Sequence, residues 1–283
     1  MTAPPLTLLY ASASRPDVVG KALDSDAHVV IVDLEDSVGR SAKDSARQVA
    51  AEMLADSLPK PVYVRINGLS TEWWQADVEA LTETGIAGLI VPKVEAASAV
   101  DGLTGRLGGR ELRIHCLLET ALGVERAFEI ASHPRVAGIS LGEADLRAET
   151  GASEEGISWA RSRVVIAAVA GGLPRPPQSV YVHVRDLDGL RISCERGRAL
   201  GQLGRTAVHP SQLPVIVDVY RPTAVEAETA RKVLHAFEDG EAAGAAAFMI
   251  EGRFADTAAL RAARLTVELA DAYGTSRSSL PQA

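Results

Sequence analysis

"CLLETALGVERAFEIA" (Cys116 to Ala131) contains the end of a strand, a charged residue and a helix in immediate succession. The apolar run that ends at Leu118 predicts a buried strand, and Val124 to Ala131 has apolar residues near helical spacing. Glu119 stands between them, at the inner end of a core strand, where a carboxylate needs a partner. A short apolar strand followed by an amphipathic helix is typical of a parallel sheet with crossover helices.

The same strand-then-helix pattern recurs along the chain. The predicted strands are Leu6 to Tyr10, Val29 to Asp33, Val62 to Ile66, Gly88 to Val91, Leu112 to Leu118, Val136 to Leu141, Ser179 to His183 and Thr206 to Val208. Eight such units predict a (β/α)8 TIM barrel, although a doubly wound sheet gives the same local pattern. No GxGxxG motif follows an early strand, so nothing indicates a dinucleotide site.

The C-terminal part of the chain exceeds what closes a barrel. We therefore predict a barrel over residues 1–222 and a C-terminal helical arm over residues 223–283. The arm contains an amphipathic helix from about Thr257 to Tyr273. We expect it to pack over the barrel mouth or onto a neighbouring subunit.

Composition bounds the class of protein. The chain has 283 residues and is 47% hydrophobic, which is enough to fill the core of a barrel. A formal net charge of −8, without a basic run, disfavours nucleic acid as a partner. No apolar run approaches the ~20 residues that span a bilayer, and the N-terminus lacks a basic leader. We expect a soluble, cytoplasmic protein without membrane association, in which Cys116 and Cys194 stay reduced.

Charged and polar residues follow the predicted strands in a consistent way. Those after the second to sixth strands and the eighth are Asp33, Glu35, Asp36, Arg65, Asn67, Lys93, Glu119, Glu143, Asp145 and His209. In a barrel, such positions gather at the C-terminal rim, where active sites of this fold are built. Their joint placement predicts a site there, whereas any one of them is unremarkable.

Glu119 and Asp145 follow adjacent predicted strands. Each alone has an ordinary explanation, since Glu119 can face the positive end of a helix dipole and Asp145 can be a turn or cap residue. Together, however, two carboxylates repel each other unless they share a cation. An oxygen-only pair without histidine or cysteine suits Mg²⁺, which prefers one or two carboxylates plus water and substrate oxygens.

Arg65 ends the third predicted strand and has two interpretations. It can form a rim ion pair with Asp33 or Glu35, or its fork can hold a carboxylate or enolate oxygen beside the metal. We expect Lys93 to be a protonated partner of the acidic residues rather than a Schiff-base amine, because dense carboxylates keep an ammonium charged.

Nine short motifs, in order and with their spacing kept, carry a resemblance to a known family. They are "LYASASRPD" (9–17), "IVDLEDSV" (31–38), "VRIN" (64–67), "VPK" (91–93), "LETALGVERAFEIA" (118–131), "GEADL" (142–146), "ARSRVVIAA" (160–168), "DLDGL" (186–190) and "VHPSQL" (208–213). On these motifs the chain resembles the citrate lyase beta-subunit-like group of the HpcH/HpaI aldolase superfamily.

The resemblance implies a (β/α)8 barrel that binds Mg²⁺ through Glu119 and Asp145, with Glu35 and Asp36 nearby and Arg65 on the oxo acid or enolate. It implies cleavage or formation of a carbon–carbon bond in a 3-hydroxyacyl-CoA thioester, such as citryl-, malyl- or citramalyl-CoA, with an acyl-CoA and an oxo acid as the cleavage products.

The resemblance also implies an acid/base role for Asp256, which an adjacent subunit often supplies in this family. A homo-oligomer, trimer or hexamer, follows from such an arm. Arg15 and Lys21, near the first strand, are candidates for contacts with CoA phosphates and are equally plausible as solvated helix residues.

Other functions stay open at this point. Some relatives add a thioesterase step and act like malate synthase, and a class II aldolase would act on free oxo acids without CoA. Gln178 and His183 stand where relatives often carry acidic residues, which leaves room for a non-catalytic assembly subunit.

Overall fold

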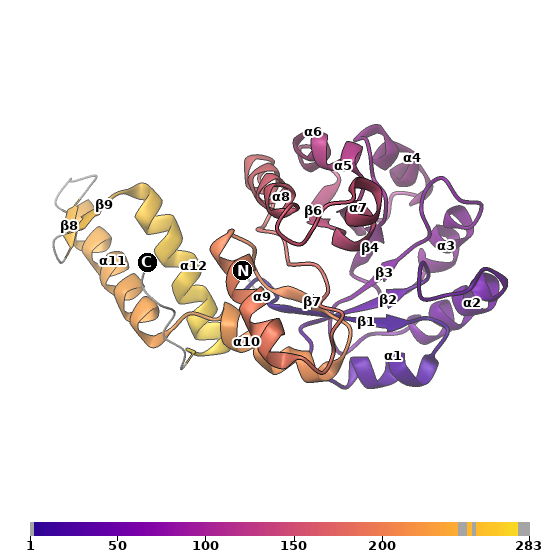
Figure 1. Ribbon diagram of the computed structural model, residues 1–283, viewed down its shortest axis with the longest axis horizontal. Helices are drawn as coiled ribbons and strands as arrows, with labels where there is room; N and C mark the ends of the chain where they lie inside the picture. Colours follow the sequence, from indigo (N-terminus) through magenta and orange to yellow (C-terminus); the bar gives the residue numbers. More distant parts are fainter. Residues whose placement is uncertain (1–2, 243–247, 251–252, 277–283) are drawn as a thin grey trace. The chain divides into compact units, whose positions relative to one another are not determined.

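Alternating strands and helices build the larger of two units in the computed structural model, which describes residues 3–242, 248–250 and 253–276 (Figure 1). This unit spans Pro5–Leu213. The other unit joins the residues before Pro5 to those from Pro214 onward.

The larger unit contains one parallel sheet of seven strands. They are β1 (Thr7–Ser12), β2 (Val29–Asp33), β3 (Val62–Arg65), β4 (Gly88–Val91), β5 (Arg113–Leu118), β6 (Val136–Leu141) and β7 (Arg205–Ala207). Their order in the sheet is β6-β5-β4-β3-β2-β1-β7, and every described pair is parallel. All five residues of β2 are buried, as expected for an apolar strand covered on both faces.

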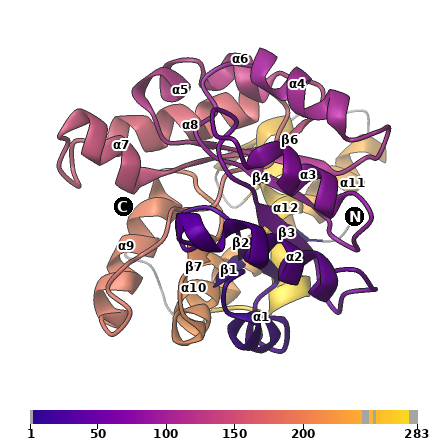
Figure 2. The same cartoon turned by 90° about the vertical axis from the view of Figure 1, so that its right-hand side faces the viewer.

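Helices surround this sheet (Figure 2). They are α1 (Pro16–Leu23), α2 (Lys43–Met53), α3 (Trp74–Leu81), α4 (Ser98–Arg106), α5 (Ala121–Glu125), α6 (Ala127–Ala131), α7 (Glu143–Thr150), α8 (Ser158–Ala170) and α9 (Leu187–Ala199), with short 3₁₀ turns at Arg40–Ala42 and Pro210–Gln212. Local sequence sets several of their starts. Thr120, for example, caps α5 by accepting a hydrogen bond from the Gly123 N–H.

One predicted strand is wrong. Ser179 to His183 does not form a strand, and this segment meets the sheet only through a bridge between Gln178 and Arg205. Pro174, Pro176 and Pro177 precede the bridge and lack the N–H that a ladder requires. Consequently β6 and β7 stand at the two ends of the strand order. The other predicted strands are confirmed to within two residues at either end.

Side chains on one face of the sheet form a small apolar cluster. Ile31, Ile90 and Leu117 are its buried members, and Leu8, Tyr10 and Tyr63 pack against them. Alternate residues of a strand point to the same face, so the residue two positions further along several of these strands points the same way. This alternation aims Asp33 and Arg65 toward the space above the cluster.

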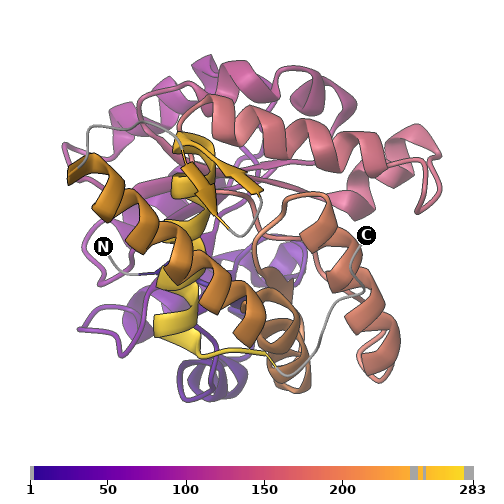
Figure 3. The same cartoon turned by 90° about the vertical axis from the view of Figure 1, so that its left-hand side faces the viewer.

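The second unit is mainly helical. It contains most of α10 (Leu213–Tyr220), then α11 (Ala224–Ala242), the antiparallel strands β8 (Phe248–Ile250) and β9 (Arg253–Ala255), and α12 (Thr257–Tyr273). The two long helices, orange to yellow in Figure 3, pack against each other. The predicted helix from Thr257 to Tyr273 is confirmed. No helix among the described residues is both long enough and apolar enough to span a membrane.

Candidate active site

Asp33 ends β2 and organises the loop that follows it. Its carboxylate accepts hydrogen bonds from the backbone N–H groups of Glu35 and Ser37, at 2.9 and 3.0 Å. Arg65, which ends β3, donates to the same carboxylate through Nε and Nη2, at 2.6 and 2.8 Å. Burial opposes ionisation of Asp33, but the hydrogen bonds from Arg65 outweigh it and hold the pKa of Asp33 below its usual value.

Arg65 is held on several sides. Nη1 lies 3.2 Å from Glu35 Oε2 and 3.4 Å from Asp36 Oδ2, and the guanidinium stacks over the Tyr10 ring at 4.9 Å from its centroid. The neighbouring carboxylates keep the pKa of Arg65 above its usual value against the effect of burial. The rim ion pair with Asp33 and Glu35 is thus present. Arg65 also lines the cavity, so it can still hold a carboxylate or enolate oxygen of a substrate while it forms this ion pair.

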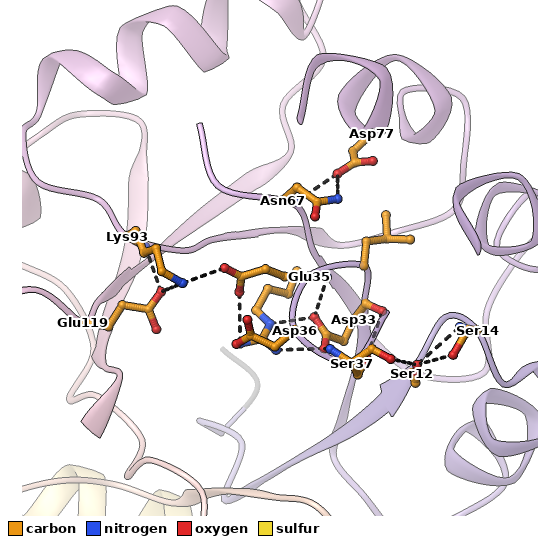
Figure 4. A network of polar contacts seen from close by, with 12 residues as sticks. Ser12, Ser14, Asp33, Glu35, Asp36, Ser37, Asn67, Asp77, Lys93 and Glu119 are labelled. Carbon is orange, nitrogen blue, oxygen red and sulfur yellow. Dashed lines mark hydrogen bonds and ion pairs between the residues drawn. The ribbon is translucent and has the colours of Figure 1, made fainter. Parts of the chain in front are cut away.

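Lys93 joins three carboxylates at one point. Its Nζ lies 2.9 Å from Glu35 Oε1, 3.0 Å from Asp145 Oδ2 and 3.5 Å from Glu119 Oε1. Figure 4 shows the contacts to Glu35 and Glu119. Despite the opposing effect of burial, these carboxylates raise the pKa of Lys93, so the predicted protonated state is confirmed. Lys93 is also the sole residue other than glycine with a positive φ, 54°, in the part of the chain that the structure describes.

Glu119 follows β5 directly and has 4% of its surface exposed. The Lys93 backbone N–H donates to Glu119 Oε1 at 3.0 Å. Burial raises the pKa of Glu119 to about 7, with nearby Glu35 and Asp145 adding to the effect and Lys93 opposing it. A buried carboxylate among other carboxylates is a site where a cation is electrostatically favoured.

Asp145 comes from the first turn of α7, after β6, and its side chain is partly exposed. Its described ion pair is the one with Lys93. The neighbouring Glu143 is occupied elsewhere, because Arg161 binds it through Nε and Nη2 at 2.8 and 2.6 Å. Asp145 and Glu119 both line the cavity and remain the predicted metal ligands.

A cavity of about 390 Å³ opens over these groups. Asp33, Asp36, Arg65, Glu119, Glu143 and Asp145 give its polar wall, and Leu8, Ile31, Ile90 and Leu117 form its apolar floor. Among the described residues no three His, Cys, Asp or Glu side chains form a metal cluster. Two carboxylates beside open space suit Mg²⁺, because this ion needs few protein ligands and keeps water or substrate oxygens in its remaining positions.

Three predicted site residues have other contacts within their own units. Arg15 and Lys21 are exposed, pair with Asp17 at 3.1 and 3.8 Å, and do not line the cavity. Asp256 belongs to the second unit, where it caps α12 by accepting from the Ala258 and Ala259 N–H groups at 2.9 and 3.1 Å. The roles predicted for all three stay predictions.

Some cavity residues were not predicted from the sequence. Tyr10, His115, Ser140 and Gln178 all line it. His115 Nε2 and Ser140 Oγ lie 3.0 Å apart, and burial lowers the pKa of His115 to about 4, so this ring is neutral near pH 7. The alternation of side chains along β5 could have indicated His115 as a cavity residue, because His115 and Leu117 point to the same face of this strand.

A family model and curated sequence relatives agree on the kind of protein to which this chain is similar. A family model described as HpcH/HpaI aldolase/citrate lyase matches residues 6–210. The chain is 34% identical to a (3S)-malyl-CoA thioesterase of Cereibacter sphaeroides (96% of this chain, 97% of the relative). It is 33% identical to an L-malyl-CoA/beta-methylmalyl-CoA lyase of Rhodobacter capsulatus, covering 93% of each chain.

Solved structures agree with these sequence relatives. CitE from Mycobacterium tuberculosis, in complex with magnesium, acetoacetate and coenzyme A, superposes with a TM-score of 0.79 at 32% identity, covering 95% of this chain and 98% of the other. A citrate lyase beta subunit from the same organism, complexed with oxaloacetate and magnesium, gives 0.69 at 34% identity, with coverage of 78% and 98%. The predicted resemblance is confirmed, and the chain belongs to the HpcH/HpaI aldolase/citrate lyase family.

Proposed function

We propose that the protein is a Mg²⁺-dependent carbon–carbon lyase that cleaves a 3-hydroxyacyl-CoA thioester into an acyl-CoA and an oxo acid. The observation that carries the proposal is the convergence of Glu35, Glu119 and Asp145 on the Lys93 ammonium beside a cavity. The relatives support it, since they include a lyase of malyl-CoA thioesters and CitE in complex with magnesium and coenzyme A.

Glu119 and Asp145 would hold the metal. The Lys93 ammonium already compensates the cluster. Burial is the main cause of the raised pKa of Glu119, and Glu35 and Asp145 add to it, so a divalent ion would stabilise the ionised carboxylates. When bound, Mg²⁺ supplies a Lewis acid that polarises the reacting carbonyl. Catalytic roles for Glu35 and Asp36 follow from their contacts with Arg65, because both carboxylates help to fix its guanidinium.

Arg65 would orient the oxo-acid end of the substrate. Asp33 holds its Nε and Nη2, so the plane of the guanidinium is fixed before substrate arrives. A preorganised cation of this kind stabilises negative charge that develops on an enolate or carboxylate oxygen. The apolar floor below it limits water near the reacting atoms.

A second group must move the proton. In cleavage the enolate of the acyl-CoA takes up a proton, and in synthesis the same carbon loses one. We assign this step to Asp256, supplied by the arm of a neighbouring subunit in a homo-oligomer, trimer or hexamer. The same proposal includes a (β/α)8-type barrel with seven regular strands over residues 1–222 and an arm over 223–283. It also includes CoA phosphates near Arg15 and Lys21 and a cytoplasmic location.

The decisive experiment follows release of acetyl- or propionyl-CoA from a panel of hydroxyacyl-CoA thioesters with Mg²⁺. Glu119→Ala and Asp145→Ala should abolish turnover while circular dichroism stays native, and Glu79→Ala, which removes an exposed carboxylate, should not. Full activity of either site variant in EDTA would refute the metal assignment. Turnover of free oxo acids and aldehydes without CoA would instead indicate a class II aldolase.

A thioesterase is the second candidate, because the chain is 34% identical to a (3S)-malyl-CoA thioesterase over nearly its full length. The products separate the two reactions. A lyase converts malyl-CoA to acetyl-CoA and glyoxylate, whereas a thioesterase gives free CoA and malate. Absence of turnover on every substrate, together with stable binding to another protein, would indicate an assembly subunit.

A further inference from the structure

A second cavity, of about 520 Å³, adjoins the candidate active site. The two cavities share Glu143, Ala144, Ser179 and Val180 as lining residues. The second one is bordered by α7, α8, α9 and the segment after Gln178. Its wall is rich in arginine, with Arg147, Arg161, Arg196 and Arg205.

The acidic residues of this wall are already engaged. Glu143 binds Arg161 through both carboxylate oxygens, and Glu154 pairs with Arg161 at 2.6 Å and with Arg147 at 3.5 Å. By contrast, no carboxylate oxygen of the described residues lies within 4.0 Å of Arg196 or Arg205. The cavity therefore carries an excess of positive charge within a chain whose formal net charge is −8.

Arg205 is the unusual member of this wall, because it is only 3% exposed. Its Nη1 donates to Gln178 Oε1 at 3.1 Å and to Ser193 Oγ at 2.9 Å. Nε is buried and has no acceptor, and Nη2 makes no hydrogen bond with any described residue. A buried guanidinium bonded only to neutral groups is destabilised relative to one with a counter-ion.

Two other arginines of the chain show what the edge formed by Nε and Nη2 of a guanidinium binds. Arg65 presents Nε and Nη2 to the two oxygens of Asp33, and Arg161 presents the same pair of atoms to Glu143. In Arg205 this edge has no carboxylate partner, and Nη2 is the donor of the edge that is not buried. Its plane is fixed through Nη1 and by the Tyr181 ring, whose centroid lies 5.4 Å from the guanidinium. Tyr181 is fixed in turn by the hydrogen bond from its hydroxyl to Asp186, at 2.6 Å.

We propose that the second cavity binds a small oxyanion, a carboxylate or a phosphate, through Nη2 of Arg205, with Arg196 as a second cation. An oxygen of a carboxylate or phosphate group accepts a short, charge-assisted hydrogen bond from such an N–H group. Ser179 and Ser193 line the same cavity and offer hydroxyl groups to the rest of the ligand. The proposal concerns a separate site and does not rest on the proposed function.

Calorimetric titration with two probes, inorganic phosphate and malonate, tests this site on the full chain without Mg²⁺ or a CoA thioester. The wild type should bind at least one probe, and which one binds identifies the class of oxyanion. Arg205→Gln should weaken the Kd by about tenfold or more, because a charge-assisted hydrogen bond and a buried positive charge are lost. Arg185→Gln removes an exposed arginine that lines neither cavity and should leave the Kd unchanged.

Arg196→Glu covers the case in which Arg205→Gln does not fold. Arg196 is exposed on α9, so reversing its charge should weaken the Kd while circular dichroism stays native. Arg65→Gln distinguishes the two cavities, and it should keep the wild-type Kd. The proposal fails if neither probe binds at millimolar concentration, or if folded Arg205→Gln binds like the wild type. It also fails if Arg65→Gln alone abolishes binding, or if Arg196→Glu has no effect when Arg205→Gln is unfolded.

Discussion

The backbone N–H of Lys93 donates to the buried carboxylate of Glu119, with N and Oε1 3.0 Å apart. Lys93 adopts a φ of 54° in this arrangement, a backbone conformation that residues other than glycine rarely take. The ammonium of the same residue contacts Glu35 and Asp145. One residue therefore compensates the acidic cluster through both its backbone and its side chain, and local strain is retained at the site where this is needed.

Replacing Lys93 with Met should destabilise the metal-free protein. The change removes the ammonium but keeps the backbone donor, so three carboxylates lose their shared cation. We expect a loss of about 1–3 kcal/mol in the free energy of unfolding, measured by urea denaturation with EDTA present. Lys21→Met removes an exposed ion pair and should change it by less than about 0.5 kcal/mol. Equal stability of Lys93→Met and wild type would show that the cluster does not depend on Lys93.

The pH dependence of stability should report the buried Glu119. Its pKa rises from the ordinary 4.5 to about 7 in the folded protein, so the folded state holds a proton that the unfolded state has already lost. The contribution to stability is thus fully present below about pH 4.5 and is lost as the pH rises through about 7. Its slope within that window approaches about 1.4 kcal/mol per pH unit.

Glu119→Gln isolates this effect, because glutamine mimics the protonated side chain at every pH. Urea denaturation in EDTA should show the stability of the wild type falling relative to the variant between about pH 5 and about pH 7. A difference that moves the opposite way with pH would mean that Glu119 is stabilised in its ionised form.

Sequence periodicity predicted most of the sheet because buried parallel strands are short, apolar and regularly spaced. It failed at Ser179 to His183, where a β-like run follows three prolines and only Gln178 pairs with the sheet. Polar residues that follow the strands were predicted to gather at one rim, and Glu35, Arg65, Glu119 and Asp145 do lie in one network of ion pairs. Contacts between distant segments, such as Arg205 with Gln178, leave no local pattern and required the folded structure.

Gly142→Ala should displace Glu119. A Cβ at this position would lie 2.4 Å from Glu119 Cβ and 2.5 Å from Glu119 Oε2, closer than side chains pack. We expect a loss of about 1–3 kcal/mol in stability, together with weaker Mg²⁺ binding by calorimetry, since the carboxylate must move. Gly105→Ala in α4 is the matched control, because a Cβ there meets nothing within 4 Å and alanine favours a helix. Unchanged Mg²⁺ affinity in Gly142→Ala would separate Glu119 from the metal site.

Asp256 allows the capping and catalytic roles to be separated by two substitutions. As the N-cap of α12 it accepts from two backbone N–H groups, and asparagine caps a helix about as well as aspartate. Asp256→Asn should therefore keep the thermal stability of the wild type, whereas Asp256→Ala should lose about 1 kcal/mol. If Asp256 moves the proton, asparagine cannot replace it, and turnover should fall by about 10²–10⁴. Steady-state assays beside thermal melts of the two variants measure both effects, and wild-type turnover in Asp256→Asn would leave Asp256 with the capping role alone.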